Sequence, residues 1–260
     1  MKKLIYILIG MALALTSCSE IDESERLEYV KPAEVGRKIL IEDFTGQKCV
    51  NCPKAVEEIE KLQKEYGADN IIAVGIHSGP LGYRGNEKNV GLATETGDEY
   101  FKHWGIEYQP QGLVNRQGGR LAHTSWAKAV HDAISQKAPL TIDISNTYNE
   151  ANHSVAIDVK ATGVEGSISG KLQVWILEDG IVAMQKMPDG TTKSDYVHNH
   201  VFRTSVNNLW GDDVTLREGE TKKSTYTLTL DKKWVADRLT VVAFVYNDNG
   251  VQQVEKKSIK

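Results

Sequence analysis

Two hydrophobic patterns follow one another along the chain, and the change between them falls near Pro139. Before it, short apolar runs over residues 38–43 and 70–77 alternate with segments in which apolar residues recur at three- and four-residue spacing. The runs predict buried strands, and the spacing predicts helices over residues 53–66 and 125–134. After Pro139 apolar and polar residues alternate, which is typical of half-buried strands.

The second half is expected to form a series of short antiparallel strands. Turn signals such as Glu178-Asp179-Gly180 separate them. The candidate strands are Leu140–Tyr148, Val155–Ala161, Lys171–Glu178, Ile181–Met187, Val197–Val206, Ser224–Leu230, Thr240–Asn247 and Val251–Ser258. This many short strands in one half of the chain predict an immunoglobulin-like β-sandwich.

The N-terminal residues predict a secreted lipoprotein. Lys2 and Lys3 precede an apolar run over residues 4–15, which has the pattern of a signal peptide and is too short to span a bilayer. The sequence Leu15-Thr16-Ser17-Cys18 follows and resembles the bacterial lipobox, in which cleavage precedes the cysteine and lipid is attached to it. We expect Cys18 to be the acylated N-terminus and the membrane anchor. An ordinary secretory signal with an incidental cysteine is the alternative.

Four segments follow from these patterns: a signal peptide over residues 1–17, an acidic tether over 18–35, and two domains over 36–138 and 139–260. The tether is too polar to bury a core and is interpreted as a solvated spacer. Its acidic residues also resemble the surface-export signals of some outer-membrane lipoproteins, which is the alternative.

Composition narrows the class of protein. The 260 residues are 40% hydrophobic and 25% charged, as in a soluble globular chain long enough for two domains. The formal net charge is −4 and no basic stripe is present in the sequence, so nucleic acid is not an expected partner. The sequence indicates no cofactor.

A Cys-x-x-Cys motif carries the most specific chemistry. Cys49 and Cys52 lie between a predicted strand and a predicted helix that begins near Pro53. A helix N-terminus favours a thiolate, because its unpaired N–H groups and dipole are positive. We therefore expect Cys49 to be a nucleophile and Cys52 to be the resolving thiol.

The surrounding residues resemble the thioredoxin superfamily. Asp43-Phe44 precedes Cys49 at the spacing found there, and Gly105-Ile106 leads to Pro110 as it leads to the cis-proline of that family. The resemblance implies that Asp43 relays a proton, or is simply a buried neutral carboxyl, and that Pro110 is cis and faces the dithiol. It also implies that Gln109 helps to bind the substrate backbone.

The motif departs from that family at two places. Lys48 replaces the usual tryptophan, and Val50-Asn51 replaces the common Gly-Pro. The expected fold class is nevertheless an α/β thioredoxin-like domain followed by an all-β immunoglobulin-like sandwich.

Three histidines are further candidates. His77 ends the second predicted strand and is either a base near the dithiol or a structural hydrogen-bonding residue. His198 and His200 share one face of a predicted strand and could be a metal pair. No carboxylate or cysteine lies at ligand spacing around them, so a polar strand face is the favoured interpretation and no metal site is predicted.

The lipobox leader, Phe44–Pro53, Ile76–Gly79 and His198–Arg203 together resemble one family. It is the outer-membrane lipoprotein family named for a protein of twenty-eight kilodaltons. The resemblance implies a lipid-anchored protein of the outer membrane, on its periplasmic face or at the cell surface.

Two functions from different classes remain open. One is an extracytoplasmic thiol–disulfide oxidoreductase whose partners are protein thiols or disulfides. The other is a surface lipoprotein that acts in binding or adhesion and in which Cys49–Cys52 is a permanent disulfide.

Overall fold

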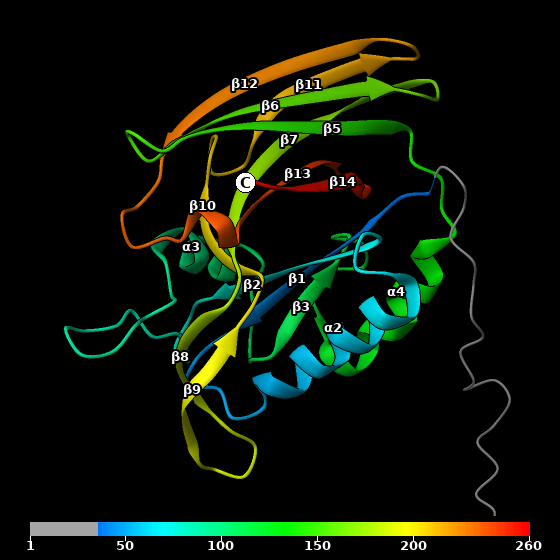
Figure 1. Cartoon of the computed structure of the whole chain (residues 1–260). Helices are drawn as coiled ribbons and strands as arrows, with labels where there is room; N and C mark the ends of the chain where they lie inside the picture. Colours follow the sequence, from blue (N-terminus) through cyan, green and yellow to red (C-terminus); the bar gives the residue numbers. More distant parts are fainter. Residues whose placement is uncertain (1–35) are drawn as a thin grey trace, which may run out of the picture.

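The structure is a computed structural model and describes residues 36–260. Most of the described chain is β-structure, in a nine-stranded mixed sheet, a three-stranded sheet and a two-stranded hairpin. Figure 1 shows the large sheet running through the middle of the molecule, with helices α2 and α4 against one end of it and the three-stranded sheet over the other. The predicted signal peptide with its lipobox Leu15–Cys18 and the predicted acidic tether lie outside the described residues.

The elements alternate between strands and helices only in the first part of the chain. In order they are β1 (Ile39–Thr45), α2 (Cys52–Tyr66), β2 (Ile71–His77), α3 (Glu95–His103), β3 (Gln111–Val114), β4 (Leu121–Ala122), η2 (His123–Ser125), α4 (Trp126–Ile134), β5 (Leu140–Asn149), β6 (Ser154–Gly163), β7 (Ser167–Glu178), β8 (Ile181–Lys186), β9 (Thr192–His198), β10 (Val201–Ser205), β11 (Asp212–Arg217), β12 (Thr221–Thr229), η3 (Ala236–Arg238), β13 (Leu239–Asn247) and β14 (Gly250–Ser258).

One sheet joins the two parts of the chain. Its strand order is β14-β13-β7-β10-β2-β1-β3-β4, with β11 also paired to β7. β1 and β2 are parallel, with Ile39 opposite Ile71, whereas β3 is antiparallel to β1. β10 lies between β2 and β7 and pairs with β2 at Val201 and Gly75. Strands from both sides of residue 138 therefore share one hydrogen-bonded sheet.

Both faces of β1 are buried, which explains its continuous apolar run. Ile39 and Ile41 pack against α2 and α4, while Leu40 and Phe44 point to the opposite face. The core on that opposite face also contains Trp175, Leu177, Phe202, Val242 and Phe244, all from strands that follow residue 138. The first and last parts of the chain thus share a hydrophobic core as well as a sheet.

The three-stranded sheet β12-β6-β5 covers the other end of the large sheet. Figure 1 shows β5, β6 and β12 in a layer over β7 and β13. Alternate residues of these strands meet in a third core, which includes Ile157 and Val159 from β6 and Val174 and Ile176 from β7.

The expected fold class is wrong. The structure is mostly β, with few helices and one large mixed sheet, and contains neither an α/β thioredoxin-like fold nor a separate sandwich following it. The physical reason is that β2 would have an unpaired edge if the first part were self-contained, and β10 occupies that edge. The strand expected over Val197–Val206 is also interrupted, because His200 has a φ of 56° and separates β9 from β10.

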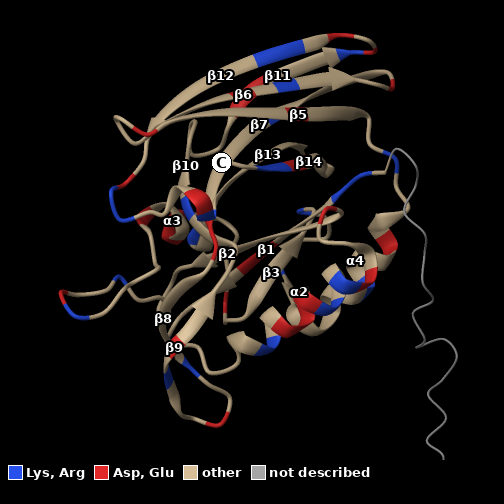
Figure 2. Ribbon diagram, in the orientation of Figure 1, with Lys and Arg blue, Asp and Glu red and all other residues tan. Residues whose placement is uncertain are grey.

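Charged residues of both signs are mixed over the outer surface. Figure 2 shows acidic and basic residues interspersed along α2 and α4 and on the strands of the upper layer. Within residues 36–260, no helix combines the length and the apolar character that crossing a bilayer requires.

Candidate functional site

The Cys-x-x-Cys motif forms a disulfide at the start of α2. Cys49 lies in the loop after β1, Cys52 is the first residue of the helix, and their Cα atoms are 5.4 Å apart. Pro53 occupies the first turn, where its missing N–H costs no hydrogen bond. Cys49 is only 1% exposed and Cys52 only 2%, so a second chain has almost no surface on either residue to contact.

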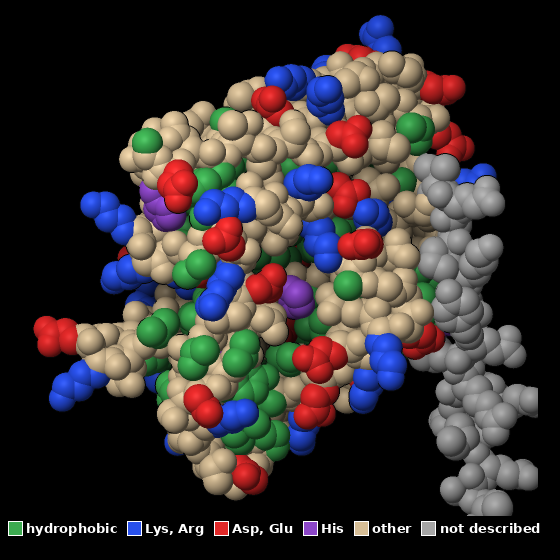
Figure 3. All heavy atoms as spheres, viewed as in Figure 1, with side chains coloured by type: hydrophobic (Ala, Val, Ile, Leu, Met, Phe, Trp, Pro, Cys, Tyr) green, Lys and Arg blue, Asp and Glu red, His purple; other side chains and the backbone are tan. Residues whose placement is uncertain are grey.

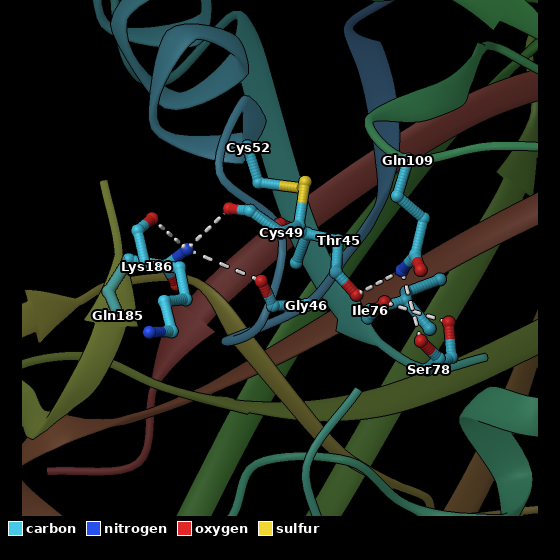
Figure 4. The surroundings of a disulfide bond; sticks show 9 residues. All are labelled: Thr45, Gly46, Cys49, Cys52, Ile76, Ser78, Gln109, Gln185 and Lys186. Atoms are coloured by element: carbon cyan, nitrogen blue, oxygen red, sulfur yellow. Dashed lines mark hydrogen bonds between the residues drawn. A yellow bond between two sulfur atoms is a disulfide. The ribbon is translucent and has the colours of Figure 1, made fainter. Parts of the chain in front are cut away.

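The β8–β9 hairpin covers this disulfide and is hydrogen-bonded to the loop that carries it. The Gln185 side-chain amide donates to the carbonyl oxygens of Cys49 at 2.9 Å and Gly46 at 3.3 Å. The backbone N–H of Lys186 donates to the Gln47 carbonyl at 2.9 Å. Figure 4 shows Gln185 reaching the cysteine loop from one side, with Gln109 on the other.

Gln47 also holds the β8–β9 hairpin against this loop, through buried hydrogen bonds. It is completely buried, and its side-chain amide donates to the carbonyls of Met184 in β8 and Val90 in the loop before α3, both at 3.1 Å. Its carbonyl oxygen accepts from the Leu92 N–H at 2.9 Å. Two chain segments are thus tied to the disulfide loop by one side chain, so uncovering the sulfurs requires several buried hydrogen bonds to break.

A small cavity of about 50 Å³ lies beneath the hairpin. Asp43, Cys52, His77 and His198 are among the residues that line it. Burial raises the pKa of Asp43 to about 8, because a charged carboxylate loses its hydration there. One carboxyl oxygen of Asp43 has no hydrogen-bond partner among the described residues. The structure therefore brings together two predicted site residues, Asp43 and Cys52.

Two of the histidines that line this cavity, His77 and His198, are neutral near pH 7. Burial, with contributions from His198 and Arg203, lowers the pKa of His77 well below its usual value. Burial also lowers the pKa of His198 to about 4, although its hydrogen bonds to the backbone of Met184 and Ala183 oppose the shift. Neutral rings can pack beside one another without charge repulsion, which suits them to hold the hairpin in place.

Pro110 and Gln109 lie at the start of β3. The Gln109–Pro110 peptide bond is cis, as expected from the sequence. The Gln109 amide donates to the carbonyls of Thr45 and Ser78, at the ends of β1 and β2. Its nitrogen is therefore committed to the protein's own backbone, and the role of Gln109 in binding substrate stays a prediction.

His198 and His200 do not lie on one strand, because β9 ends at His198 and β10 begins at Val201. His198 is buried beneath the hairpin, whereas the His200 ring lies 3.2 Å from the Asp179 carboxylate. Throughout the described chain, His, Cys, Asp and Glu side chains form no group of three or more that could hold a metal ion.

Sequence reasoning missed the residues that cover the disulfide and also a buried ion pair elsewhere in the structure. Nothing in the sequence around Gln47 or Gln185 indicates that these side chains cover a site. Glu42 does give a signal, because a carboxylate in the middle of an apolar strand needs a partner. That partner is Arg116, which forms two hydrogen bonds of 2.8 Å with the Glu42 carboxylate.

The outer surface where the β8–β9 hairpin meets the start of α2 is partly apolar. Figure 3 shows hydrophobic side chains gathered where the β8–β9 hairpin meets the start of α2. Val50 and Val197 are exposed in these two segments.

Comparison with known proteins identifies the family. The model of the family described as outer membrane protein Omp28 matches residues 97–260, which is more than half of the chain. The chain belongs to the Omp28 family. This membership confirms both the resemblance noted in the sequence and the expected outer-membrane lipoprotein localisation. Cys18, the residue expected to carry the lipid, lies outside the described residues.

Solved structures resemble the chain over different extents. HBP35 of Porphyromonas gingivalis is 17% identical, with a TM-score of 0.67 over 89% of this chain and 77% of that one, a likeness of fold alone. A domain of the outer membrane lipoprotein Omp28 from the same organism is 25% identical and covers 47% of this chain and 89% of its own, with a TM-score of 0.36. No curated protein sequence matches the chain.

Proposed function

We propose that the protein is a binding lipoprotein of the outer membrane in which Cys49–Cys52 is a structural disulfide. The observation that carries the proposal is the burial of both cysteines beneath the β8–β9 hairpin. Thiol–disulfide exchange requires an attacking thiolate to approach one sulfur directly, and a protein substrate needs room around it. Membership of an outer-membrane lipoprotein family supports the same conclusion.

In this function the disulfide fixes the loop on which the hairpin rests. Gln47 and Gln185 bind backbone groups of residues 46–49 and 184–186, so the geometry of this loop decides whether the hydrogen bonds can form. A crosslink across the start of α2 also reduces the conformational freedom of the unfolded chain, although its loop is short.

A second candidate function is thiol–disulfide exchange, and Asp43 is the observation that favours it. A buried carboxyl with a pKa raised to about 8, in the cavity that Cys52 lines, could take a proton from a resolving thiol. An external dithiol would first have to reduce Cys49–Cys52, and its own sulfurs would be oxidised to a disulfide. The Cys49 thiolate would then attack a substrate disulfide and release one substrate thiolate. Cys52 would then attack the mixed disulfide, restore Cys49–Cys52 and release the second substrate thiol. The hairpin would have to lift for the first step.

Native-state reduction separates the two functions. The full chain is incubated with tris(2-carboxyethyl)phosphine, free thiols are alkylated, and the modified fraction is measured by mass spectrometry. We expect the disulfide to persist in the folded protein and to be reduced rapidly in denaturant. Rapid native reduction, together with mixed disulfides trapped by Cys52→Ala and none by Cys49→Ala, would establish the exchange function instead.

A substitution in the β8–β9 hairpin tests whether the hairpin protects the disulfide from reduction. Gln185→Ala removes the side-chain hydrogen bonds to Gly46 and Cys49, and we expect native reduction to become at least about tenfold faster, since 1.4 kcal/mol corresponds to a factor of ten. Gln136→Ala is the matched control. Gln136 follows α4, and its side chain accepts a hydrogen bond from Arg37 and not from the hairpin. Equal rates in both variants would show that the hairpin does not protect the disulfide.

A further inference from the structure

A second concave site lies away from the disulfide, at the junction of α3, β7, β11 and the β13–β14 hairpin. Its volume is about 740 Å³, and Trp104, Arg116, Trp210 and Tyr246 are among its lining residues. We call it the aromatic groove. Ligand sites in proteins are typically about 300–1,000 Å³ and combine aromatic walls with a few polar groups, and this groove has both features.

The walls of the aromatic groove are held in place. The ring of His103 packs against both Trp104 and Trp210, at centroid distances of 5.1 Å and 4.1 Å. The Tyr246 hydroxyl donates to the Trp210 carbonyl at 2.7 Å. A site whose aromatic side chains are already fixed loses little conformational entropy when a ligand binds.

Two buried donors in the groove have no partner. The side chain of Arg116 is only 2% exposed, and its Nε and Nη2 atoms bond Glu42, but Nη1 has no hydrogen-bond partner among the described residues. The indole N–H of Trp104 is likewise buried and unpartnered there. A buried donor left without an acceptor is costly, so an acceptor atom supplied by a ligand would be stabilising.

Each cation of the groove is paired with a carboxylate. Glu42 neutralises Arg116, and Asp213 lies 2.7 Å from the Lys171 ammonium at the rim. Asp248 also lines the groove and is exposed, so an anion would meet a further negative charge. This arrangement disfavours phosphates and carboxylates and favours an uncharged ligand.

We propose that the aromatic groove binds an uncharged carbohydrate. A sugar ring has one face of C–H groups, which suits the negative face of the Trp210 ring, and a rim of hydroxyls that accept hydrogen bonds from Arg116 and Trp104. The Arg116 guanidinium itself lies over the Tyr246 and Trp104 rings, 4.3 Å and 5.3 Å from their centroids. No charged group of the ligand is required. The inference rests on the proposed function of a binding lipoprotein and names its ligand class.

The test is a neutral and acidic glycan array probed with the full chain, solubilised in a detergent that carries no sugar. Hits are followed by titration of tryptophan fluorescence, with maltotriose, cellotriose and triacetylchitotriose as neutral probes. Glucuronic acid and adenosine serve as the charged and the planar aromatic probe. We expect saturable binding of at least one neutral glycan and none of the last two.

Variants locate the site. Trp210→Ala should weaken binding at least tenfold, and Trp104→Phe, which keeps a ring but removes the N–H, should weaken it less. Tyr108→Ala should bind as the parent does, because Tyr108 is an exposed aromatic residue outside the groove. Circular dichroism of each variant confirms that it is folded.

Failure of this inference and failure of the proposed function give different results. Absence of binding to every neutral glycan, preference for the charged or planar probe, or equal affinity of Trp210→Ala and the parent would each overturn the carbohydrate site. None of these results changes the reducibility of Cys49–Cys52, which alone decides between the structural disulfide and the exchange function.

Discussion

The rings of His77 and His198 meet edge to face, with their centroids 5.2 Å apart. His77 ends β2 in the central sheet, and His198 ends β9 in the hairpin that covers the disulfide. Both rings are buried, and each has one nitrogen without a hydrogen-bond partner among the described residues. This contact joins the hairpin to the sheet and depends on both rings being neutral.

Acid should therefore destabilise the protein through these histidines. The pKa of His198 is about 4 in the folded chain and near 6.5 when unfolded, so the unfolded chain binds an extra proton between these pH values. The stabilisation is fully present above pH 6.5 and is lost as the pH falls toward 4, by up to about 1.4 kcal/mol per pH unit. His77, whose pKa is also lowered by burial, acts in the same direction.

Denaturant titrations at pH 7.5, 6 and 4.5 check this expectation by comparing His198→Asn with the parent. The parent should lose stability across the acidic range more steeply than the variant. His123→Asn is the control, because His123 lies in η2, outside the hairpin, and forms no ion pair with another described residue, so the parental pH dependence should be retained. Parallel pH profiles for the parent and His198→Asn would contradict the assignment.

Asp43 should act in the opposite direction. Its pKa is about 8 in the folded chain and 3.8 when unfolded, so the folded chain holds a proton that the unfolded chain has lost. Stability therefore decreases as the pH rises from about 4 to about 8, again by up to about 1.4 kcal/mol per pH unit. Asp43→Asn, which cannot ionise, should be similar to the parent at pH 4 and more stable than it at pH 8.

Calorimetric melting of Asp43→Asn and the parent at pH 4, 6 and 8 measures this difference. Asp195→Asn is a suitable control, since Asp195 is an exposed residue of β9. A stability difference that is constant over this pH range would show that Asp43 does not gain a proton on folding.

The local elements could be predicted from the sequence, because their causes are local. β1 was expected from its apolar run, and α2 from the spacing of residues such as Ile59 and Leu62, both of which are buried. β11 was not predicted, since its exposed positions and the pair Asp212-Asp213 hide a short alternation. The break at His200 was missed for another reason. Its N–H bonds the Asp179 carboxylate and its carbonyl accepts from Gly75, and these partners are remote in sequence.

The candidate site was predictable to the same limited extent. Cys49, Cys52 and Asp43 were found because they lie in one short motif. Gln185, which covers them, is separated from Cys49 by 136 positions, and nothing in a single sequence indicates that the two meet. The hairpin, not the motif, determines whether the sulfurs are accessible, so the chemistry of the site was the part that the sequence left open.

The buried ion pair of Glu42 and Arg116 should be important for stability. Glu42→Ala would leave a guanidinium buried without its counter-charge, and we expect a loss of about 3–5 kcal/mol in the free energy of unfolding. Replacing both residues with methionine should cost less than Glu42→Ala, because no unpaired charge remains. Lys128→Ala provides the contrast. It breaks an exposed pair with Asp132 and should change stability by about 0.5 kcal/mol or less. Equal losses in the two alanine variants, measured by urea unfolding, would contradict this ranking.

The division of the chain at residue 138 stays a prediction, and a chain truncated to residues 36–138 tests it. In the whole protein Gly75 donates its N–H to the His200 carbonyl, and β10 covers the edge of β2. The apolar face formed by Leu40, Phe44 and Val74 packs against Trp175, Phe202 and Phe244. Truncation removes these partners, so we expect the fragment to bind a hydrophobic dye and to lose a cooperative melting transition.

The core beneath α2 and α4 is the feature that could keep the fragment folded. Ile39, Ile41, Ile59, Trp126 and Val130 all belong to it, and none of its buried members follows residue 138. If the fragment melts cooperatively and keeps a native near-ultraviolet signal, this core suffices and residues 36–138 are a domain. If only residues 36–260 melt cooperatively, the core that contains Phe44, Trp175 and Phe202 is required for folding. Because the fragment would expose a whole face of β1 and β2 together with an unpaired strand edge, we expect the second result.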